Sequence, residues 1–257
     1  MPTRPHDQLR ELKITRGFTK TAAGSVLWQQ GETIVLCTAS VTQDVPPWFG
    51  TKVVGGWLTA EYVMLPASTP QRKPWPKTGH TDSRGTEIQR LIGRVLRGIV
   101  DLTRIGPHTI HVDCQVLQAD GGTRTASICG AVLAIRDALR TLPKTLTPKF
   151  DDPDRTIGPT EQMYAPEKAL VDDLAAVSVG IIDGQAYLDL DYVLDSKAQV
   201  DLNLAYTASG KFVEIQGSAE SKPAEGKAAG FDMNQLQTLL DLGRKGCTQL
   251  MDAMRKA

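Results

Sequence analysis

The sequence predicts an α+β fold made of two successive halves, each built from strands followed by a helical segment. Apolar and polar residues alternate first in each half, as in half-buried strands, and an apolar stripe with helical spacing follows. A polar stretch at 144–170 separates the halves, because it carries four prolines and no apolar periodicity. We therefore expect a first unit at 1–143, a linker at 144–170 and a second unit at 171–257.

Strands of the first half are predicted where apolar residues recur with period two between glycine-containing turns. They are expected at 13–18, 25–29, 33–41, 56–64 and 109–117. One helix is expected at 83–100, where Ile88, Leu91, Ile92 and Val95 share a face, and a second helix follows the last strand to about residue 142.

The second half repeats this outline without a clear sequence repeat. Its strands are expected at 175–182, 186–192, 199–206 and 212–217. Gly184 and Gly210 supply turns between them. The last helix is expected from about 232 to 254, where leucines recur along one side.

Composition is that of an ordinary soluble domain and excludes several classes. The 257 residues include 29 basic and 29 acidic side chains, so bulk charge does not indicate a strongly basic nucleic-acid binder. The four cysteines form no CxxC pair, which predicts buried free thiols and no zinc site. No apolar leader begins the chain, and its apolar stretches are too short to span a bilayer. We expect a cytoplasmic protein.

The stretch 118–125 carries the strongest chemical signal, because two glycines stand at the expected strand-to-helix turn. Gly121 and Gly122 allow a sharp bend and a close approach to a ligand. Free amides and the dipole at the helix start favour an anion. Thr123 and Thr125 add hydroxyl donors, and the planar fork of Arg124 matches a phosphate. We predict a phosphate site; the alternative is a tight turn beside a solvated arginine.

Two further basic regions are candidates for contacts with phosphate groups. Arg84 begins the helix at 83–100, where an anion is favoured, whereas Arg90 lies farther along it and could simply be solvated. The segment 66–82 is irregular and proline-rich. It combines basic and aromatic residues, which suit a single-stranded nucleic acid or a solvated loop equally well; they are Arg72, Lys73, Trp75 and Lys77.

A run of aspartates in the second half is the other chemical candidate. In a strand at 186–192, Asp189 and Asp191 share the face opposite the leucines, and Asp195 follows just beyond it. Clustered carboxylates suit Mg²⁺, or one of them could pass a proton to a leaving oxygen. The alternative is the solvent face of an edge strand.

These motifs, taken together, resemble the ribonuclease PH family of phosphorolytic exoribonucleases. The resemblance is carried by colinear blocks at 7–10, 24–27, 36–39, 45–47, 56–62, 87–94, 113–127, 188–192 and 213–217. It implies two βαβα-type halves, the first like domain 2 of ribosomal protein S5 and the second like the C-terminal domain of ribonuclease PH. There are three departures from the family. Ser83-Arg84-Gly85 stands where the family usually has Gly-Arg-Thr, and Leu194 stands where it typically has glutamate. Ala67 and Trp75 stand where we expect two further loop arginines.

The resemblance also implies a function and a set of site residues. Inorganic phosphate is expected as co-substrate on Arg84, Thr123 and Arg124, with Gly122 and Thr125 at the same turn. Asp189 and Asp195 are expected to serve Mg²⁺ or proton transfer. The implied reaction is reversible, phosphate-dependent 3′→5′ trimming of tRNA precursors, which releases nucleoside diphosphates.

The implied assembly is a homohexameric ring, a trimer of dimers. RNA would be contacted by Arg90 and by the segment with Arg72, Lys73, Trp75 and Lys77. Two other readings remain open: a non-catalytic ring subunit that binds RNA or partner subunits, and a phosphorylase of small nucleotides.

Overall fold

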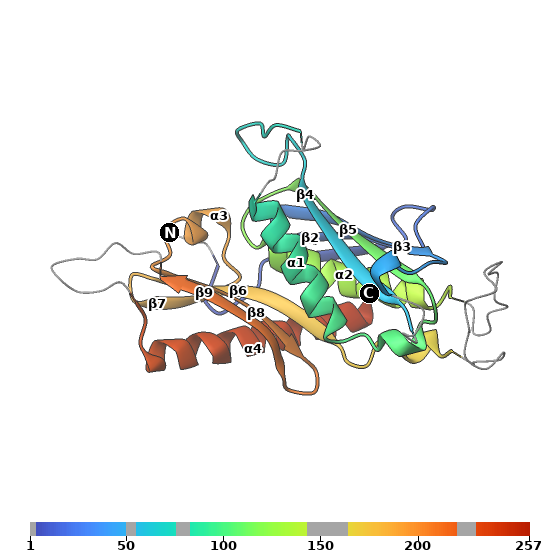
Figure 1. The fold of residues 1–257 in the computed structure, drawn as a ribbon. Helices are drawn as coiled ribbons and strands as arrows, with labels where there is room; N and C mark the ends of the chain where they lie inside the picture. The colour runs from blue at the N-terminus through green and yellow to red at the C-terminus, as the bar shows by residue number, and fades with distance from the viewer. Residues whose placement is uncertain (1–3, 50–54, 76–82, 143–163, 220–229) are drawn as a thin grey trace, which may run out of the picture.

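The computed structural model describes residues 4–49, 55–75, 83–142, 164–219 and 230–257, and these form two sheets with helices packed against them (Figure 1). The first sheet has five strands in the order β1-β2-β3-β5-β4, and the second has four in the order β7-β6-β8-β9. The predicted α+β class with two halves is confirmed.

The first sheet is antiparallel except for the parallel pair β4 and β5. Its strands are β1 (Leu12–Arg16), β2 (Gly24–Gln30), β3 (Thr33–Thr42), β4 (Trp57–Met64) and β5 (Thr109–Gln118). A parallel pair needs a crossover connection, and helix α1 (Ser83–Arg97) provides it between β4 and β5. Short 3₁₀ turns lie at Pro47–Phe49 and Leu102–Arg104.

The second sheet is wholly antiparallel. Its strands are β6 (Leu174–Ile182), β7 (Gln185–Leu188), β8 (Val200–Thr207) and β9 (Phe212–Ala219). The short helix α3 (Tyr192–Asp195) follows β7, and the long helix α4 (Met233–Lys256) closes the chain. Helix α4 begins with a capping box, in which Asp232 accepts from the Gln235 backbone while the Gln235 side chain reaches back to Asp232.

Helix α2 (Thr123–Leu139) lies at the centre of the core, against strands of both sheets. It is apolar on nearly every side, which is the pattern of a buried helix. Small residues allow the close contact: a Cβ added to Gly24 of β2 would lie 1.9 Å from the Ala134 carbonyl oxygen. The helix that starts at the glycine turn is therefore the element that joins the two halves.

The end of the predicted linker is packed against the first half. Ala169 is fully buried, and its carbonyl accepts from the Asp101 backbone N–H at 2.7 Å. Val171 donates to the Ile99 carbonyl at 2.9 Å, and a 3₁₀ turn occupies Pro166–Lys168. Residues 143–163 lie outside the described residues, so the unit boundaries at 143 and 171 stay predictions.

The cysteine prediction is confirmed, because all four thiols are free and buried. Burial raises the pKa of Cys129 to about 12. Among the described helices, none combines the length and the apolar character that crossing a membrane requires.

Candidate active site

The two glycines of the predicted phosphate turn connect β5 to α2 in a conformation that favours glycine. Gly121 and Gly122 both have positive φ, at 71° and 64°, and Gly122 is the N-cap of α2. A Cβ on Gly121 would lie 2.5 Å from the Leu190 carbonyl oxygen. The turn therefore packs directly on the backbone that precedes α3.

The basic residues predicted for phosphate converge on one buried hydroxyl. Tyr62 on β4 places its hydroxyl 2.8 Å from Thr123 Oγ1. Burial raises the pKa of Tyr62, while the Thr123 hydrogen bond and the charges of Arg84 and Arg124 oppose that rise. The Thr123 hydroxyl and the charges of two arginines, Arg84 on α1 and Arg124 on α2, therefore act on this one hydroxyl.

A different role is observed for Thr125 from the one predicted. Its hydroxyl donates to the Gly122 carbonyl at 2.9 Å, and the residue is only 5% exposed. A threonine hydroxyl has one hydrogen to donate. In this structure the Thr125 hydroxyl stabilises the first turn of α2, and its contact with phosphate stays a prediction.

The predicted acidic strand is also different in the structure, because β7 ends at Leu188. Asp189 adopts a positive φ of 57°, and Asp191 caps α3 by accepting from the Leu194 backbone at 2.9 Å. Residues 189–192 therefore turn away from the sheet, and period-two alternation stops at Leu188. Tyr192 is consequently 64% exposed and does not continue the apolar face.

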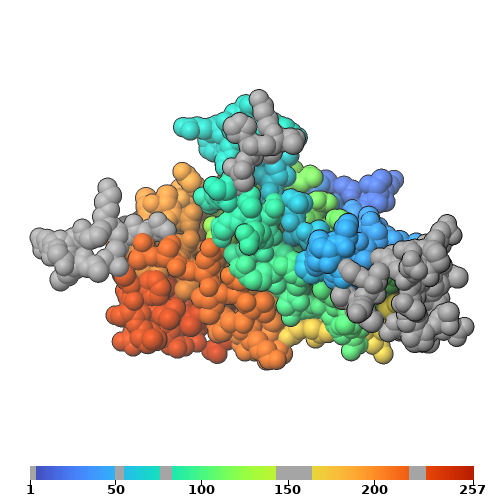
Figure 2. All heavy atoms as spheres, viewed as in Figure 1, coloured from blue at the N-terminus to red at the C-terminus, as the bar shows by residue number. Residues whose placement is uncertain are grey.

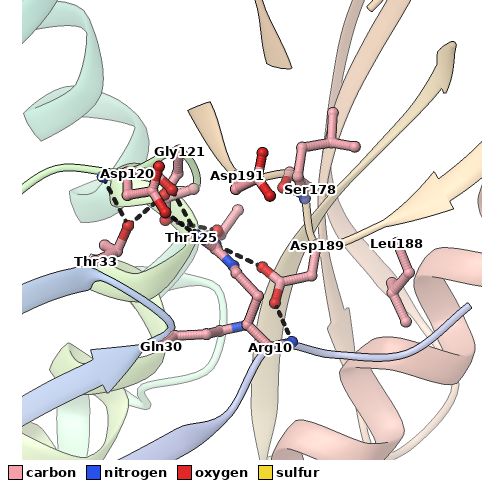
Figure 3. Close-up of polar contacts among 12 residues, drawn as sticks. Arg10, Gln30, Thr33, Asp120, Gly121, Thr125, Ser178, Leu188, Asp189 and Asp191 are labelled. Carbon is pink, nitrogen blue, oxygen red and sulfur yellow. Dashed lines mark hydrogen bonds and ion pairs between the residues drawn. The ribbon is translucent and has the colours of Figure 1, made fainter. Parts of the chain in front are cut away.

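Asp189 is held in an ion pair between the two halves of the molecule (Figure 3). Arg10 Nη2 lies 2.7 Å from Asp189 Oδ1, and the Arg10 backbone N–H donates to Oδ2 at 2.8 Å. Burial by itself would raise the pKa of Asp189, but the charge and hydrogen bonds of Arg10 outweigh it and lower that pKa. The Asp189 carboxylate is therefore ionised and buried.

This geometry gives Asp189 a structural role, and its role as a metal ligand or proton donor stays a prediction. Both of its carboxylate oxygens accept from Arg10, and the residue is 1% exposed. The described residues also contain no group of three or more histidine, cysteine, aspartate or glutamate side chains arranged to hold a metal ion. Asp189 and Asp195 as ligands of Mg²⁺ therefore stay a prediction.

Asp195 stands at the end of α3, and α3 is attached to the glycine turn. Asp120 Oδ1 accepts from the backbone N–H of Tyr192, the first residue of α3, at 3.2 Å. Asp195 follows one helical turn later, which is a rise of about 5 Å. Asp195 is half-buried, and it belongs to the helix whose first residue is bonded to the turn.

The residue before Asp195 is part of a small apolar cluster. Leu194 is 5% exposed and packs with Ile182, Leu190 and Ala198. The departure from glutamate seen in the sequence thus replaces a charged side chain with a buried apolar one. Its effect is to fix α3 on the second sheet.

The residues predicted for RNA contact lie on two separate surfaces. Arg72 and Trp75 are exposed in the segment after β4, which projects from the top of the molecule in Figure 2. Lys73 in the same segment contacts Met64 through its Nζ, 3.3 Å from the sulfur. Arg90 lines a groove of about 220 Å³ between α1 and β4, with Glu61 on its other side. Lys77 lies outside the described residues.

Sequence reasoning missed three residues that shape this site. Tyr62 and Gln216 approach Thr123 and Arg124 from β4 and β9, and Arg10 approaches the turn from the N-terminal segment. Each comes from a strand or segment far from the motif in the chain. Their only signal was membership in the colinear blocks that carry the family resemblance.

Two profiles of one protein family match the chain in sequence. The first, described as 3′ exoribonuclease family, domain 1, matches residues 8–140. The second, domain 2 of the same family, matches residues 174–246. The chain belongs to the 3′ exoribonuclease family. The predicted family and its exoribonuclease activity are thereby confirmed.

Curated members of the 3′ exoribonuclease family resemble the chain over almost its whole length. Ribonuclease PH of Rhodopirellula baltica is 49% identical over 247 residues, which cover 96% of this chain and 92% of the relative. Ribonuclease PH of Corynebacterium efficiens is 48% identical over 255 residues, covering 99% and 94%.

Solved structures share the fold at much lower identity. The Archaeoglobus fulgidus exosome with RNA bound to the active site contains a chain with a TM-score of 0.74 and 19% identity, covering 97% of this chain and 90% of that one. Rice Rrp46 gives a TM-score of 0.70 at 19% identity, covering 98% and 97%.

Proposed function

We propose that this chain shortens tRNA precursors from the 3′ end by phosphorolysis. The observation that supports the proposal is the contact between Thr123, at the N-terminus of α2, and the Tyr62 hydroxyl, on which the charges of Arg84 and Arg124 also act. Two guanidinium groups, a hydroxyl and a helix start form a site for a dianion. The relatives named ribonuclease PH support RNA as the substrate, and tRNA processing fits that name.

In this proposal, phosphate is the nucleophile and the last phosphodiester is the electrophile. An oxygen of inorganic phosphate forms a bond to phosphorus while the bond from phosphorus to the 3′ oxygen breaks. The products are a nucleoside diphosphate and an RNA shorter by one nucleotide. One phosphate linkage replaces another, so the reverse reaction proceeds when diphosphates are abundant.

The arginines act by electrostatics rather than by covalent chemistry. Phosphoryl transfer spreads negative charge over the equatorial oxygens, and preorganised cations stabilise it. Arg124 is held in place by Gln216 at 2.6 Å, so its charge is oriented before substrate arrives. The leaving 3′ oxygen requires a proton, and Asp195 is the carboxyl group that we assign to this step.

No catalytic step is assigned to Mg²⁺. The family resemblance implies it, with Asp189 and Asp195 as the residues that would hold it. Asp189 already accepts from Arg10 in this structure. The steps that this chain performs are binding of phosphate, orientation of its charge and delivery of one proton.

We also propose a ring of six identical chains. Exposed apolar side chains on the second sheet's edge strand β9, Phe212 and Ile215, are 40% and 46% exposed in the single chain. Edge strands with exposed apolar groups are covered in stable assemblies. Analytical ultracentrifugation should give a mass near six times that of one chain, and a monomer would contradict the ring.

The experiment that tests the activity uses a tRNA precursor with a 5′ label and several extra 3′ nucleotides. Incubation with phosphate should give a ladder of products one nucleotide apart, with nucleoside diphosphates in solution. Omission of phosphate should abolish the ladder. A ladder without phosphate, with nucleoside monophosphates released, would mean hydrolysis and would refute the proposal. RNA binding with no shortening would favour the non-catalytic subunit.

A further inference from the structure

One glutamine links the two helices that carry the proposed phosphate ligands. Gln216 lies on β9 of the second half, and its Oε1 accepts from Arg124 Nη1 at 2.6 Å. Its Nε2 donates to Glu87 Oε1 at 2.8 Å. Glu87 lies on α1, three residues after Arg84. A single amide therefore contacts α2 at one atom and α1 at the other.

The chemistry of the two neighbours fixes the orientation of this amide. A guanidinium only donates, and an ionised carboxylate only accepts. The carbonyl oxygen of Gln216 consequently faces Arg124, and its amino group faces Glu87. Rotating the amide by half a turn would place two donors together and two acceptors together, so Glu87 holds the acceptor of Gln216 toward Arg124.

A neutral acceptor suits an arginine that has to bind an anion. Glutamate at position 216 would form an ion pair with Arg124. Its negative charge would then offset the positive charge that attracts phosphate to Arg124. It would also repel Glu87 across a distance of less than 3 Å. Glutamine orients the guanidinium and leaves its full positive charge available.

Packing between the two halves restricts the side chains of Arg124 and Gln216. They line a cavity of only about 10 Å³ between the halves, together with Leu91, Ile128 and Leu204. These apolar neighbours limit the space beside the contact between Arg124 and Gln216, whereas the contact of Gln216 with Glu87 is exposed.

We infer that Gln216 is a positioning residue, which presents Arg124 to inorganic phosphate as an uncompensated cation and takes its own orientation from Glu87. This inference rests on the proposed phosphate site at Arg124. It adds a specific requirement for a neutral acceptor at position 216, which no other part of the site supplies.

The test uses Gln216→Met, which keeps the length of the side chain and removes both hydrogen bonds. The KM for inorganic phosphate should rise about tenfold, because hydrogen bonds to charged groups carry an effect of that order. The KM for RNA should stay near that of the unaltered protein. In an Arg124→Ala background, Gln216→Met should add no further change in the KM for phosphate, because Gln216 acts through Arg124.

The matched control is Glu214→Gln. Glu214 lies on the same strand and pairs with Arg94 of the same helix α1, at 2.9 Å, but it makes no hydrogen bond to Arg124. Glu214→Gln weakens the ion pair between α1 and β9 without removing the hydrogen-bond acceptor of Arg124. It should leave the KM for phosphate unchanged. Equal KM values for Gln216→Met, Glu214→Gln and the unaltered protein would overturn the inference.

An exchange of the two partners separates orientation from charge. The double variant Gln216→Glu with Glu87→Gln can keep both hydrogen bonds, with position 87 now donating to position 216, but it places a negative charge beside Arg124. We expect the melting temperature to be retained and the KM for phosphate to stay raised about tenfold or more. A KM for phosphate equal to that of the unaltered protein would show that charge at position 216 is irrelevant and would overturn that part of the inference.

Failure of this inference is distinguishable from failure of the proposed function. Phosphate-independent shortening by the unaltered protein would refute the function. Phosphate-dependent shortening, with a large effect of Arg124→Ala and none of Gln216→Met, would refute only the role of Gln216.

Discussion

The ion pair between Arg10 and Asp189 joins three parts of the chain that meet beside the proposed phosphate site. Arg10 Nη2 lies 2.7 Å from Asp189 Oδ1, and Arg10 Nη1 donates to the Asp120 carbonyl at 2.5 Å. Asp120 belongs to the glycine turn of the first half, and Asp189 precedes α3 of the second half. Figure 3 shows Arg10 between them. The pair therefore holds the turn and α3 in register.

Removal of the carboxylate from this pair should destabilise the fold strongly. Asp189→Asn leaves the buried Arg10 guanidinium with only the Asp120 carboxylate, 3.9 Å away, as counter-charge. Breaking a buried pair costs about 3–5 kcal/mol of unfolding free energy. Denaturant titration at neutral pH measures the change. The control Asp252→Asn breaks an exposed pair with Arg255 and should cost less than about 1 kcal/mol. A small change at Asp189 would show that the pair does not stabilise the fold.

The same carboxylate should contribute to the pH dependence of stability. The pKa of Asp189 is lowered in the folded protein, where the charge of Arg10 outweighs burial. A lowered folded pKa gives stability that is present above the unfolded pKa, about 3.9, and is lost as pH falls toward the folded pKa. The difference in unfolding free energy between the unaltered protein and Asp189→Asn should therefore be largest near pH 7 and shrink below about pH 4. A constant difference across that range would contradict this assignment.

Arg124 should be required for the use of phosphate. Arg124→Ala removes a preorganised cation, and kcat/KM for phosphate should fall by about 10²–10³. The control is Arg140→Ala at the other end of α2, where the side chain is 65% exposed. Steady-state rates of diphosphate release as a function of phosphate concentration measure both variants. An equal loss of kcat/KM in Arg124→Ala and Arg140→Ala would mean that both substitutions disturb helix α2, and that Arg124 has no specific role in the phosphate site.

Asp195 should act on the leaving oxygen. Asp195→Asn should slow phosphorolysis by about 10²–10⁴ on ordinary RNA, because it removes the proton donor. An RNA whose last linkage carries sulfur in place of the bridging 3′ oxygen has a leaving group that needs no proton. Single-turnover rates on the sulfur substrate should be nearly the same for Asp195→Asn and the unaltered protein. A loss of the same size on both substrates would exclude proton donation.

Leu194 should not tolerate the glutamate that the family typically has at this position. Its side chain is packed with Ile182, Leu190 and Ala198, so a carboxylate would be buried without a partner. Leu194→Glu should lower the unfolding free energy by about 2–4 kcal/mol. The control Val193→Glu lies next to it, is 57% exposed and should have an effect near zero. Thermal unfolding of both variants makes the comparison, and an unchanged melting temperature for Leu194→Glu would contradict the packing argument.

Local patterns were sufficient for most elements of the fold. Period-two alternation predicted β2, β3, β5, β6 and β8 to within about two residues of their bounds, and helical spacing placed α1, α2 and α4. The glycine turn at 121 and 122 was also visible, because the switch from strand to helix periodicity occurs on either side of it. The prediction of a strand through the aspartates after Leu188 was wrong. The sequence keeps alternating apolar and acidic residues through Tyr192, whereas the backbone turns at Asp189.

What the sequence by itself determined is the composition of the site: two arginines, a threonine and an aspartate at positions typical of phosphoryl transfer. Tertiary structure decided which partners these and the other predicted residues meet. Asp189 accepts from Arg10, and the Thr125 hydroxyl donates to the Gly122 carbonyl. Arg124 is oriented by Gln216, which is distant from it in the chain. The physical reason is that a hydrogen bond depends on which atoms meet in space, and only the packing of the two halves brings Arg10, Gln216 and the turn together.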